Sequence, residues 1–333
     1  MKERVKWIDI VKFFGIFAIY LGHFGVLAGN SYYFVFTHHV PLFFFVSGCM
    51  ETFNKEEQFG VYFIKKIKSI MIPFWTFAAL AAVVTVIHRG YSWEYAKALI
   101  VEVLRGVVRN TYVAGSLWFL TCLFSLQLMF FFVKKLKNSV VIMLGAIIVY
   151  YVANYLLPKH PLGQPSMYYN IDSALYYMIY YTIGYVLFPY ILKVFELNSL
   201  KKKLVFIITG IVSVGYTMGV FFGFDMLSMI QFPVWASIYT AVFATCLMIY
   251  AYFVIARMIE DATALADIGR NTLYLCGSEY MIRIIFASFL AIFGIEMGIP
   301  NPLSGYLCTG ILLIVANKYL VPIEKYIINK IVR

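Results

Sequence analysis

The sequence predicts an all-α fold, a polytopic transmembrane helical bundle of about ten spans with its N- and C-termini cytoplasmic. Composition is the first indication: hydrophobic residues make up 62% of the 333 residues and charged residues only 13%. A soluble chain this apolar lacks the polar side chains that cover a folded surface. We expect residues 1–333 to form a single membrane-embedded domain, because a helical bundle in lipid can run to this length.

The second indication is the number of long apolar stretches. A bilayer core of about 30 Å requires roughly 20 apolar residues per helix. Ten stretches satisfy this requirement: 7–28, 37–54, 69–88, 114–133, 139–157, 172–193, 204–222, 233–257, 271–293 and 304–322. The first stretch is too long for a signal peptide, and no small-residue cleavage site follows it. The Pro- and Gly-rich stretch 158–165 is expected to be an exposed loop.

The third indication is the distribution of basic residues, which orients the spans. With the N-terminus inside, the inner segments hold 20 Lys and Arg residues and the outer segments hold 5, while Lys12 and Arg283 lie within spans. Cytoplasmic loops of membrane proteins carry such an excess. Four of the five outer charges fall in 89–113, which we expect to form a helix at the outer interface or one that dips back into the bundle.

Nucleic-acid binding and metal binding are not indicated. The net charge of +11 comes from short basic clusters between apolar stretches, so no basic face is available for nucleic acid. Adjacent His38 and His39 point about 100° apart on a helix and cannot chelate together; they face an outer vestibule or lie in the interface. The five cysteines fit neither a metal pattern nor a disulfide framework and are expected to be buried thiols: Cys49, Cys122, Cys246, Cys276 and Cys308.

Ionisable residues inside a span are costly and are therefore candidate functional residues. The first stretch holds Asp9, Lys12 and His23. Asp9 and Lys12 are one turn apart and can pair. Lys12 and His23 are eleven residues apart, which places both on one helix face, roughly 16 Å apart along the axis. A snorkelling anchor is the alternative for Lys12, and an interhelical hydrogen bond is the alternative for His23.

Two more charged groups are candidates. Glu279 and Arg283 are i, i+4 neighbours in the ninth stretch. They form either a structural ion pair between helices or a functional pair that lines the same cavity as His23. Lys65 and Lys68 are i, i+3 neighbours before the third stretch, and either bind phosphate at the inner mouth or supply positive-inside charge in contact with anionic lipid.

Six motifs in chain order resemble acyltransferase family 3, the bacterial membrane acyltransferases that O-acylate surface glycans. Residues 7–23 look like its first helix, with the basic residue, ten-residue gap and histidine at Lys12 and His23. The stretches 38–48, 65–75, 172–185 and 268–273 resemble further motifs, and 115–120 matches a Gly-x-Leu-Trp-Phe-Leu signature. Many members carry histidine where this chain has Glu279, which leaves the role of that position open.

The resemblance implies an acyl-CoA-dependent O-acyltransferase, most often an O-acetyltransferase, in the bacterial inner membrane. Acetyl-CoA or another acyl-CoA would be the donor, and a surface polysaccharide or lipid-linked glycan the acceptor. Lys65, Lys68 and Lys12 would hold the CoA phosphates. His23 would take the proton of the sugar hydroxyl or first accept the acyl group itself.

The remaining candidates have supporting roles under this interpretation. Asp9 would orient Lys12 by pairing, while Glu279 and Arg283 would serve the acceptor side or stabilise charge. The alternative function is a polytopic transporter with a buried His, Glu and Arg relay. The sequence has no inverted repeat and no paired Gly- or Pro-interrupted helices, which favours the enzyme.

Overall fold

The computed structural model of the chain describes residues 5–24, 28–90, 92–109, 115–294 and 302–332. Every regular element in these ranges is a helix, as the sequence predicts, and none of these residues lies in a strand. Eight helical segments of the described residues are long and apolar enough to cross a membrane. The other two predicted spans correspond to α1 (Lys6–Gly22) and α8 (Ser139–Tyr155), apolar helices of 17 residues each. The chain is a multi-pass helical membrane protein.

Several predictions concern residues outside the described ranges. Three basic residues that contribute to the predicted charge asymmetry lie outside them: Lys2, Arg4 and Arg333. Parts of three predicted segments also lie outside them: residues 25–27 of the first span, 91 and 110–113 of the segment 89–113, and 114 of the fourth span. The described part of 89–113 contains α6 (Trp93–Leu104), so the helical character of that segment is confirmed. Residues 158–165 form no helix and are largely exposed, as predicted for a loop.

The helices form two compact units, and each unit is assembled from separate stretches of chain. The first consists of Met1–Thr52, Ile183–Thr272 and Gly298–Ile314, and the second of Phe53–Thr182, Leu273–Met297 and Val315–Arg333. The long helix α9 (Ile171–Phe195) contributes its first half to the second unit and its last half to the first.

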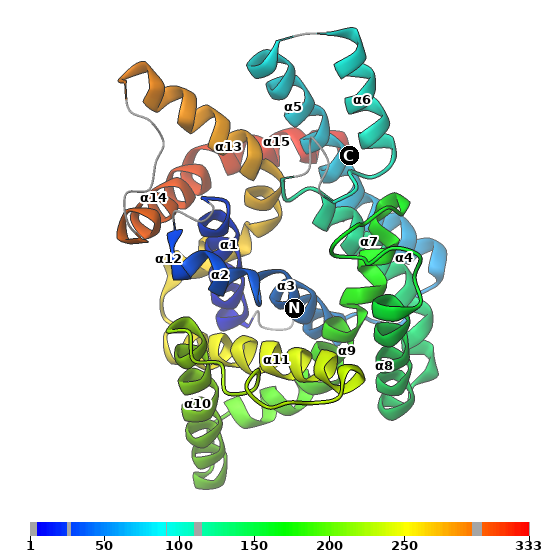
Figure 1. The fold of residues 1–333 in the computed structure, drawn as a ribbon, viewed down its shortest axis with the longest axis vertical. Helices are drawn as coiled ribbons and strands as arrows, with labels where there is room; N and C mark the ends of the chain where they lie inside the picture. The colour runs from blue at the N-terminus through cyan, green and yellow to red at the C-terminus, as the bar shows by residue number, and fades with distance from the viewer. Residues whose placement is uncertain (1–4, 25–27, 91, 110–114, 295–301, 333) are drawn as a thin grey trace. The chain divides into compact units, whose positions relative to one another are not determined.

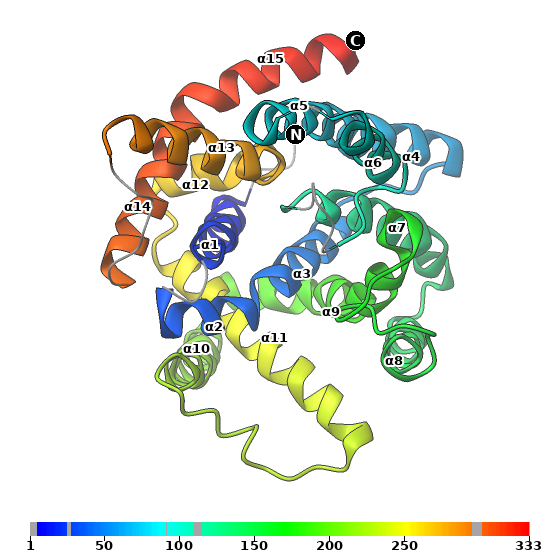
Figure 2. The ribbon, with the colours of Figure 1, turned by 45° about the horizontal axis from the view of Figure 1, so that its top comes forward.

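The first unit is built around α1. Its other helices are the last half of α9, α2 (Asn30–Phe36), α3 (His39–Glu51), α10 (Leu200–Phe221), α11 (Val234–Met258), α12 (Thr263–Arg270) and most of α14 (Pro302–Val315). Helix α1 packs against α2, α3, α11 and α12, and α10 lies beside α11 (Figures 1 and 2). The buried Trp7 ring lies 5.1–6.2 Å, centroid to centroid, from the rings of Phe188, Phe195 and Phe253. This aromatic cluster ties α1 to α9 and α11.

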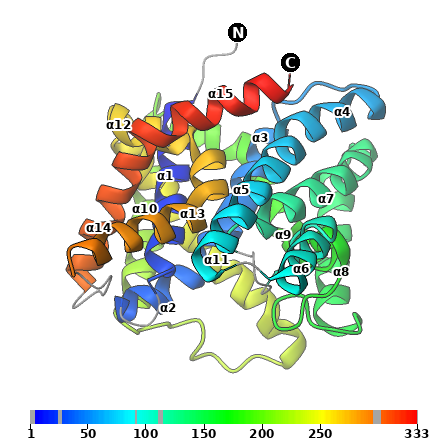
Figure 3. The same ribbon diagram turned by 90° about the horizontal axis from the view of Figure 1, so that it is seen from above.

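The second unit has its core between α5 and α7. Its elements are α4 (Phe59–Lys66), η2 (Ile67–Met71), α5 (Ile72–Arg89), α6, α7 (Trp118–Val133), η3 (Lys134–Leu136), α8, η4 (Tyr168–Asn170), the first half of α9, α13 (Thr272–Ile292), η5 (Ala316–Leu320) and α15 (Val321–Val332). Helix α4 continues through η2 into α5, α6 folds back beside α5, and α15 packs on α5 (Figure 3). Phe74, Phe77 and Leu120 are buried in this core. Gly277 of α13 faces the Phe77 ring, which fills the space of a β-carbon.

Side-chain caps mark the start of three helices, and several predicted span boundaries are wrong, as the first two spans show. Ser92, Asn138 and Ser199 precede α6, α8 and α10, and each side chain accepts a hydrogen bond from a backbone N–H of the first turn. The first predicted span extends to residue 28, but α1 ends at Gly22, a poor helix former. The second predicted span begins at residue 37, but the apolar segment begins at residue 30 and is divided into α2 and α3 by the non-helical backbone of His38.

Candidate active site

Asp9 and Lys12 form the predicted ion pair in the first turns of α1. The Lys12 Nζ lies 3.3 Å from the Asp9 Oδ1, and Asp9 is only 2% exposed. A carboxylate near the N-terminus of a helix is stabilised by the helix dipole as well as by its cation. Gly269 of α12 packs against this turn so closely that a β-carbon would lie 2.6 Å from the Asp9 carbonyl carbon and 3.0 Å from the Phe13 nitrogen. The glycine of the motif at 268–273 therefore allows α12 to approach the ion pair.

His23 is the C-cap residue of α1. Its backbone is near-helical, with φ −77° and ψ −5°, and its N–H donates to the Ile19 carbonyl over 3.2 Å. The helical register therefore extends to His23, which keeps it on the Lys12 face and roughly 16 Å from it along the axis. The imidazole Nδ1 is enclosed by protein. Gly22 beside it faces Val35 and Phe36 of α2, each 3.1 Å from the position of a β-carbon, so α2 packs closely against the last turn of α1.

A buried histidine–tyrosine contact was missed at the sequence level. The His38 Nε2 lies 2.8 Å from the Tyr252 hydroxyl of α11, and its Nδ1 lies 3.1 Å from the Thr37 hydroxyl. The Tyr252 ring also packs on Phe14 of α1, with centroids 5.3 Å apart. His38 and His39 are both buried, so the expectation of an outer vestibule or interface is wrong for them. These contacts tie His38, at the break between α2 and α3, to α11 within the first unit.

Glu279 and Arg283 form the second predicted ion pair. The Arg283 Nε contacts the Glu279 Oε1 within α13, and Glu279 is fully buried while the Arg283 side chain is 24% exposed. A buried carboxylate of this kind requires its cation, because an unpaired charge in a low-dielectric interior is strongly unfavourable. The pair can therefore present a fixed guanidinium to an anionic or hydroxyl-bearing group on its accessible side.

The Gly-Ser of the 115–120 motif lies against the same turn of α13. Gly115 has φ +33°, and a β-carbon there would lie 3.0 Å from Tyr280 and 3.6 Å from the Glu279 Oε2. The Ser116 hydroxyl donates to the Cys276 carbonyl. Glycine is needed at 115 both for its backbone angle and for its contact with α13. The motif thus fixes the entry to α7 beside the Glu279 carboxylate.

A basic patch lies at the junction of α4, η2 and η3, and comprises Lys65, Lys66, Lys68 and Lys134. Lys65 pairs with Glu57 and keeps 63% of its side chain exposed, and Lys68 is exposed. The ammonium groups of Lys66 and Lys134 lie 4.8 and 5.1 Å from the centroid of the buried Tyr62 ring. Such cation–π contacts hold lysine side chains in place. Lys66 and Lys134 were not predicted as site residues, because the contact of Lys134 with Tyr62 joins residues 72 positions apart.

The helical register between Lys65 and Lys68 differs from the expected one. Lys65 lies in α4, whereas Lys68 lies in η2, a stretch of π-helix. The wider turn of a π-helix changes the angle between the two side chains, and such turns are frequent at functional sites. Both lysines therefore belong to the exposed patch, but their side chains are not aligned on one face as i, i+3 neighbours of an α-helix would be.

The predicted site residues are distributed over both units. Asp9, Lys12 and His23 belong to the first unit, and Glu279 and Arg283 belong to the second. The expectation that Glu279 and Arg283 line the same cavity as His23 stays a prediction. Among the described residues no group of three or more His, Cys, Asp or Glu side chains could hold a metal ion, and all five cysteines are free thiols.

Comparison with known protein families identifies the family of the chain. A family described as "Acyltransferase domain" matches residues 5–317, a range that contains every motif and every candidate residue named above. Searches of curated proteins and of solved structures found no match.

Proposed function

Since the chain belongs to the acyltransferase-domain family and is a multi-pass membrane protein, we propose that it is an O-acyltransferase of glycans. It moves an acyl group, most often acetyl, from cytoplasmic acyl-CoA to a hydroxyl of a cell-surface polysaccharide or a lipid-linked glycan. The observation that carries the proposal is the extent of the match, from residue 5 to residue 317, which includes the buried charged pairs of both units.

The proposed setting is the bacterial inner membrane with both termini in the cytoplasm. The excess of 20 basic residues on the inner segments over 5 on the outer segments supports this orientation. It places the basic patch and the start of α1 on the cytoplasmic side, where acyl-CoA is available. His23, at the other end of α1, then lies toward the outer side.

The donor binds through its phosphates. Lys65, which also pairs with Glu57, and Lys68 supply exposed charge at the inner mouth, and Lys66 and Lys134, held against the Tyr62 ring, add two positioned ammonium groups. Lys12, oriented by its bond to Asp9, is a further proposed phosphate ligand; it belongs to the first unit, whereas the four lysines of the patch belong to the second. The roughly 16 Å between Lys12 and His23 is of the order of a pantetheine arm, so the thioester reaches the imidazole.

The transfer step follows from the chemistry of an imidazole beside a thioester. The His23 imidazole takes the proton of the sugar hydroxyl as its oxygen attacks the thioester carbon. The C–S bond breaks, and the thiolate of CoA leaves and takes up that proton from the imidazolium. In the covalent variant, a neutral nitrogen of His23 attacks the thioester carbon, the C–S bond breaks and the CoA thiolate leaves. The acyl group then passes from that nitrogen to the sugar oxygen, and the hydroxyl proton goes to the thiolate. Arg283, fixed by Glu279, stabilises negative charge on the acceptor side.

Incorporation of label from acetyl-CoA tests the proposal. Membranes containing the protein are incubated with [¹⁴C]acetyl-CoA, and label is measured in the polysaccharide and lipid-linked glycan fractions. Wild-type membranes are expected to transfer label, and membranes with the His23→Ala variant at equal abundance are not. Absence of label in all glycan fractions, with a range of acyl-CoA chain lengths, would contradict the proposed donor and acceptor while leaving the family assignment intact.

A further inference from the structure

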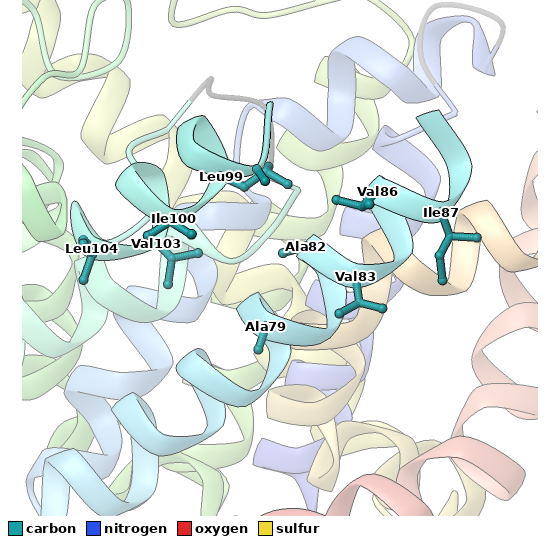
Figure 4. A pocket seen from close by; sticks show the side chains of 10 residues that line it. Ala79, Ala82, Val83, Val86, Ile87, Leu99, Ile100, Val103 and Leu104 are labelled. Carbon is teal, nitrogen blue, oxygen red and sulfur yellow. The ribbon is translucent and has the colours of Figure 1, made fainter. Parts of the chain in front are cut away.

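The second unit contains an aliphatic groove between α5 and α6. It has a volume of about 440 Å³, and every side chain that lines it is alanine, valine, leucine or isoleucine (Figure 4). Val83 and Val86 of α5 face Ile100 and Val103 of α6 across it. Val83 is 57% exposed and Leu104 at one end is 70% exposed, so the groove is open along its length. The groove is therefore an open, apolar surface feature of a membrane protein.

The chemistry of the lining selects a hydrocarbon chain as the occupant. An extended peptide segment would bring unpaired N–H and C=O groups, and these lining side chains offer nothing to which they could hydrogen-bond. The same argument excludes ordered water, which needs polar partners. Bilayer lipid surrounds the protein at this surface and supplies chains that need only van der Waals contact.

The length of α6 explains why the groove remains open. Helix α6 has 12 residues and is therefore about 18 Å long, well short of a hydrocarbon core of about 30 Å. It lies beside α5, which has 18 residues and is about 27 Å long. A lipid chain can lie where a full-length helix would otherwise pack. The lined part, from Ala79 to Ile87 on α5, extends about 12 Å along the helix.

The first turn of α6 provides a place for the lipid headgroup. Ser92 caps the helix, and the Lys97 ammonium lies 5.3 Å from the centroid of the exposed Trp93 ring and 3.4 Å from the Glu94 carboxylate. Tryptophan and lysine in this combination are typical of the membrane–water interface. The aliphatic residues Ala96, Ile100 and Leu104 follow on one face, so the helix changes from interfacial to apolar along the groove.

We propose that this groove binds one acyl chain of a membrane glycerophospholipid, with the lipid headgroup at Trp93 and Lys97. The occupant is a lipid of the surrounding bilayer, separate from the acyl donor and the glycan acceptor. All of its residues lie between positions 79 and 104, and none of them is assigned a role in the proposed transfer reaction.

Photocrosslinking in a defined bilayer tests this proposal. The full-length protein is reconstituted into phosphatidylcholine and phosphatidylglycerol vesicles that contain a phosphatidylcholine with a diazirine halfway along one chain. After irradiation, labelled peptides are identified by mass spectrometry. The peptides of α5 and α6 are expected to be labelled several-fold more than the exposed aliphatic face of α10, which includes Ile207, Ile208 and Ile211. Equal labelling of the two surfaces would overturn the proposal.

A matched pair of variants tests the location. Val83→Trp fills the groove, whereas Val101→Trp places the same side chain on α6 outside the groove, and the two valines are 57% and 52% exposed. Only Val83→Trp is expected to reduce labelling of α6, and Ala82→Phe is expected to do the same if Val83→Trp does not fold. Loss of labelling with Val101→Trp as well would contradict the site.

The same experiment distinguishes two other occupants of the groove, a second copy of the chain and a polyprenyl carrier. If the groove instead bound a second copy of the chain, Val83→Trp would change the oligomeric mass and no phospholipid label would be found there. If it bound a polyprenyl carrier, added polyprenyl phosphate would displace the label whereas excess unlabelled phosphatidylcholine would not. Either result would overturn the proposed phospholipid.

Discussion

At the scale of single residues, the two buried ion pairs are the features that most constrain the chemistry. Both were predicted from spacing alone, because residues three or four apart on a helix are neighbours whatever the tertiary structure. The contacts of His38 with Tyr252 and of Lys134 with Tyr62 were missed, since they join residues 214 and 72 positions apart. Spacing within one helix therefore predicts local pairs, while pairs between helices depend on packing that the sequence does not show.

Variants of the Glu279–Arg283 pair test whether the pair has a structural or a functional role. Arg283→Leu leaves the buried Glu279 charge without its cation. Loss of one partner of a fully buried pair costs about 3–5 kcal/mol of unfolding free energy, and we expect a smaller loss here because solvent reaches part of the Arg283 side chain. Glu279→Gln combined with Arg283→Leu is expected to recover most of that stability. Thermal unfolding of the purified variants measures this, and acetyl transfer is measured on the same samples.

The double variant decides between the two roles. If the pair acts in transfer, the double variant is stable but inactive. Stability and activity that both return would show that the pair serves only to hold α13, and would remove Arg283 from the proposed mechanism.

Gly269 tests the close approach of α12 to the Asp9–Lys12 pair. Gly269→Ala places a methyl group against the Asp9 carbonyl, which is backbone and cannot rotate away. Overpacking of this kind typically costs about 1–3 kcal/mol, and we expect at least that loss in thermal unfolding. Gly145→Ala in α8 is the matched control, because no atom lies within 4 Å of its β-carbon position. Equal effects of the two substitutions would contradict the packing of α12 on α1.

At the scale of elements, hydropathy located all ten predicted helices but misplaced several ends. The apolar pattern continues past Gly22 and through residues 30–51, so hydropathy alone cannot show that α1 ends at Gly22 or that α2 and α3 are separate helices. The π-helical turn at Ile67–Met71 was also not predicted, because its residues are ordinary helix formers. Helix ends and irregular turns are decided by tertiary packing rather than by composition.

The α4–η2 junction is expected to bind the donor. Replacing Lys65 and Lys68 together with Gln should raise the KM for acyl-CoA with little change in kcat, because phosphate contacts are made equally in the ground and transition states. Exposed charge contacts are screened, so the wild-type KM should also rise with ionic strength. Lys203→Gln at the start of α10 is a control with a similarly exposed lysine.

Binding of a non-hydrolysable CoA analogue to the purified variants provides the decisive measurement. An unchanged Kd in the double Gln variant would remove both lysines from the donor site. Lys65→Arg with Lys68→Arg should retain binding, since arginine keeps the charge and offers two donors to a phosphate.

At the scale of the whole molecule, the sequence predicted a multi-pass helical protein and the acyltransferase family, and both predictions are confirmed. The division of the chain into two compact units was not predicted. Each unit combines stretches far apart in sequence, such as Met1–Thr52 with Ile183–Thr272, and no linker of distinct composition marks the division. Composition and hydropathy indicate that each helix lies in an apolar environment, but they do not indicate which helices pack together.

The orientation of the whole chain is testable: we expect the turn between α9 and α10 to be cytoplasmic and the loop at 158–171 to be external. Single cysteines are introduced at Lys159 and Lys203 in a background without the five native cysteines. Lys203 is chosen over Lys202 because replacing Lys202 would break its ion pair with Glu196, an interaction that lowers the pKa of that carboxyl. Both chosen positions are exposed, so a difference in labelling reports the side of the membrane. An impermeant maleimide added to intact cells should label Cys at 159 and leave Cys at 203 unlabelled until the membrane is opened. Labelling at 203 from outside would reverse the orientation, and with it the assignment of the basic patch to a cytoplasmic donor.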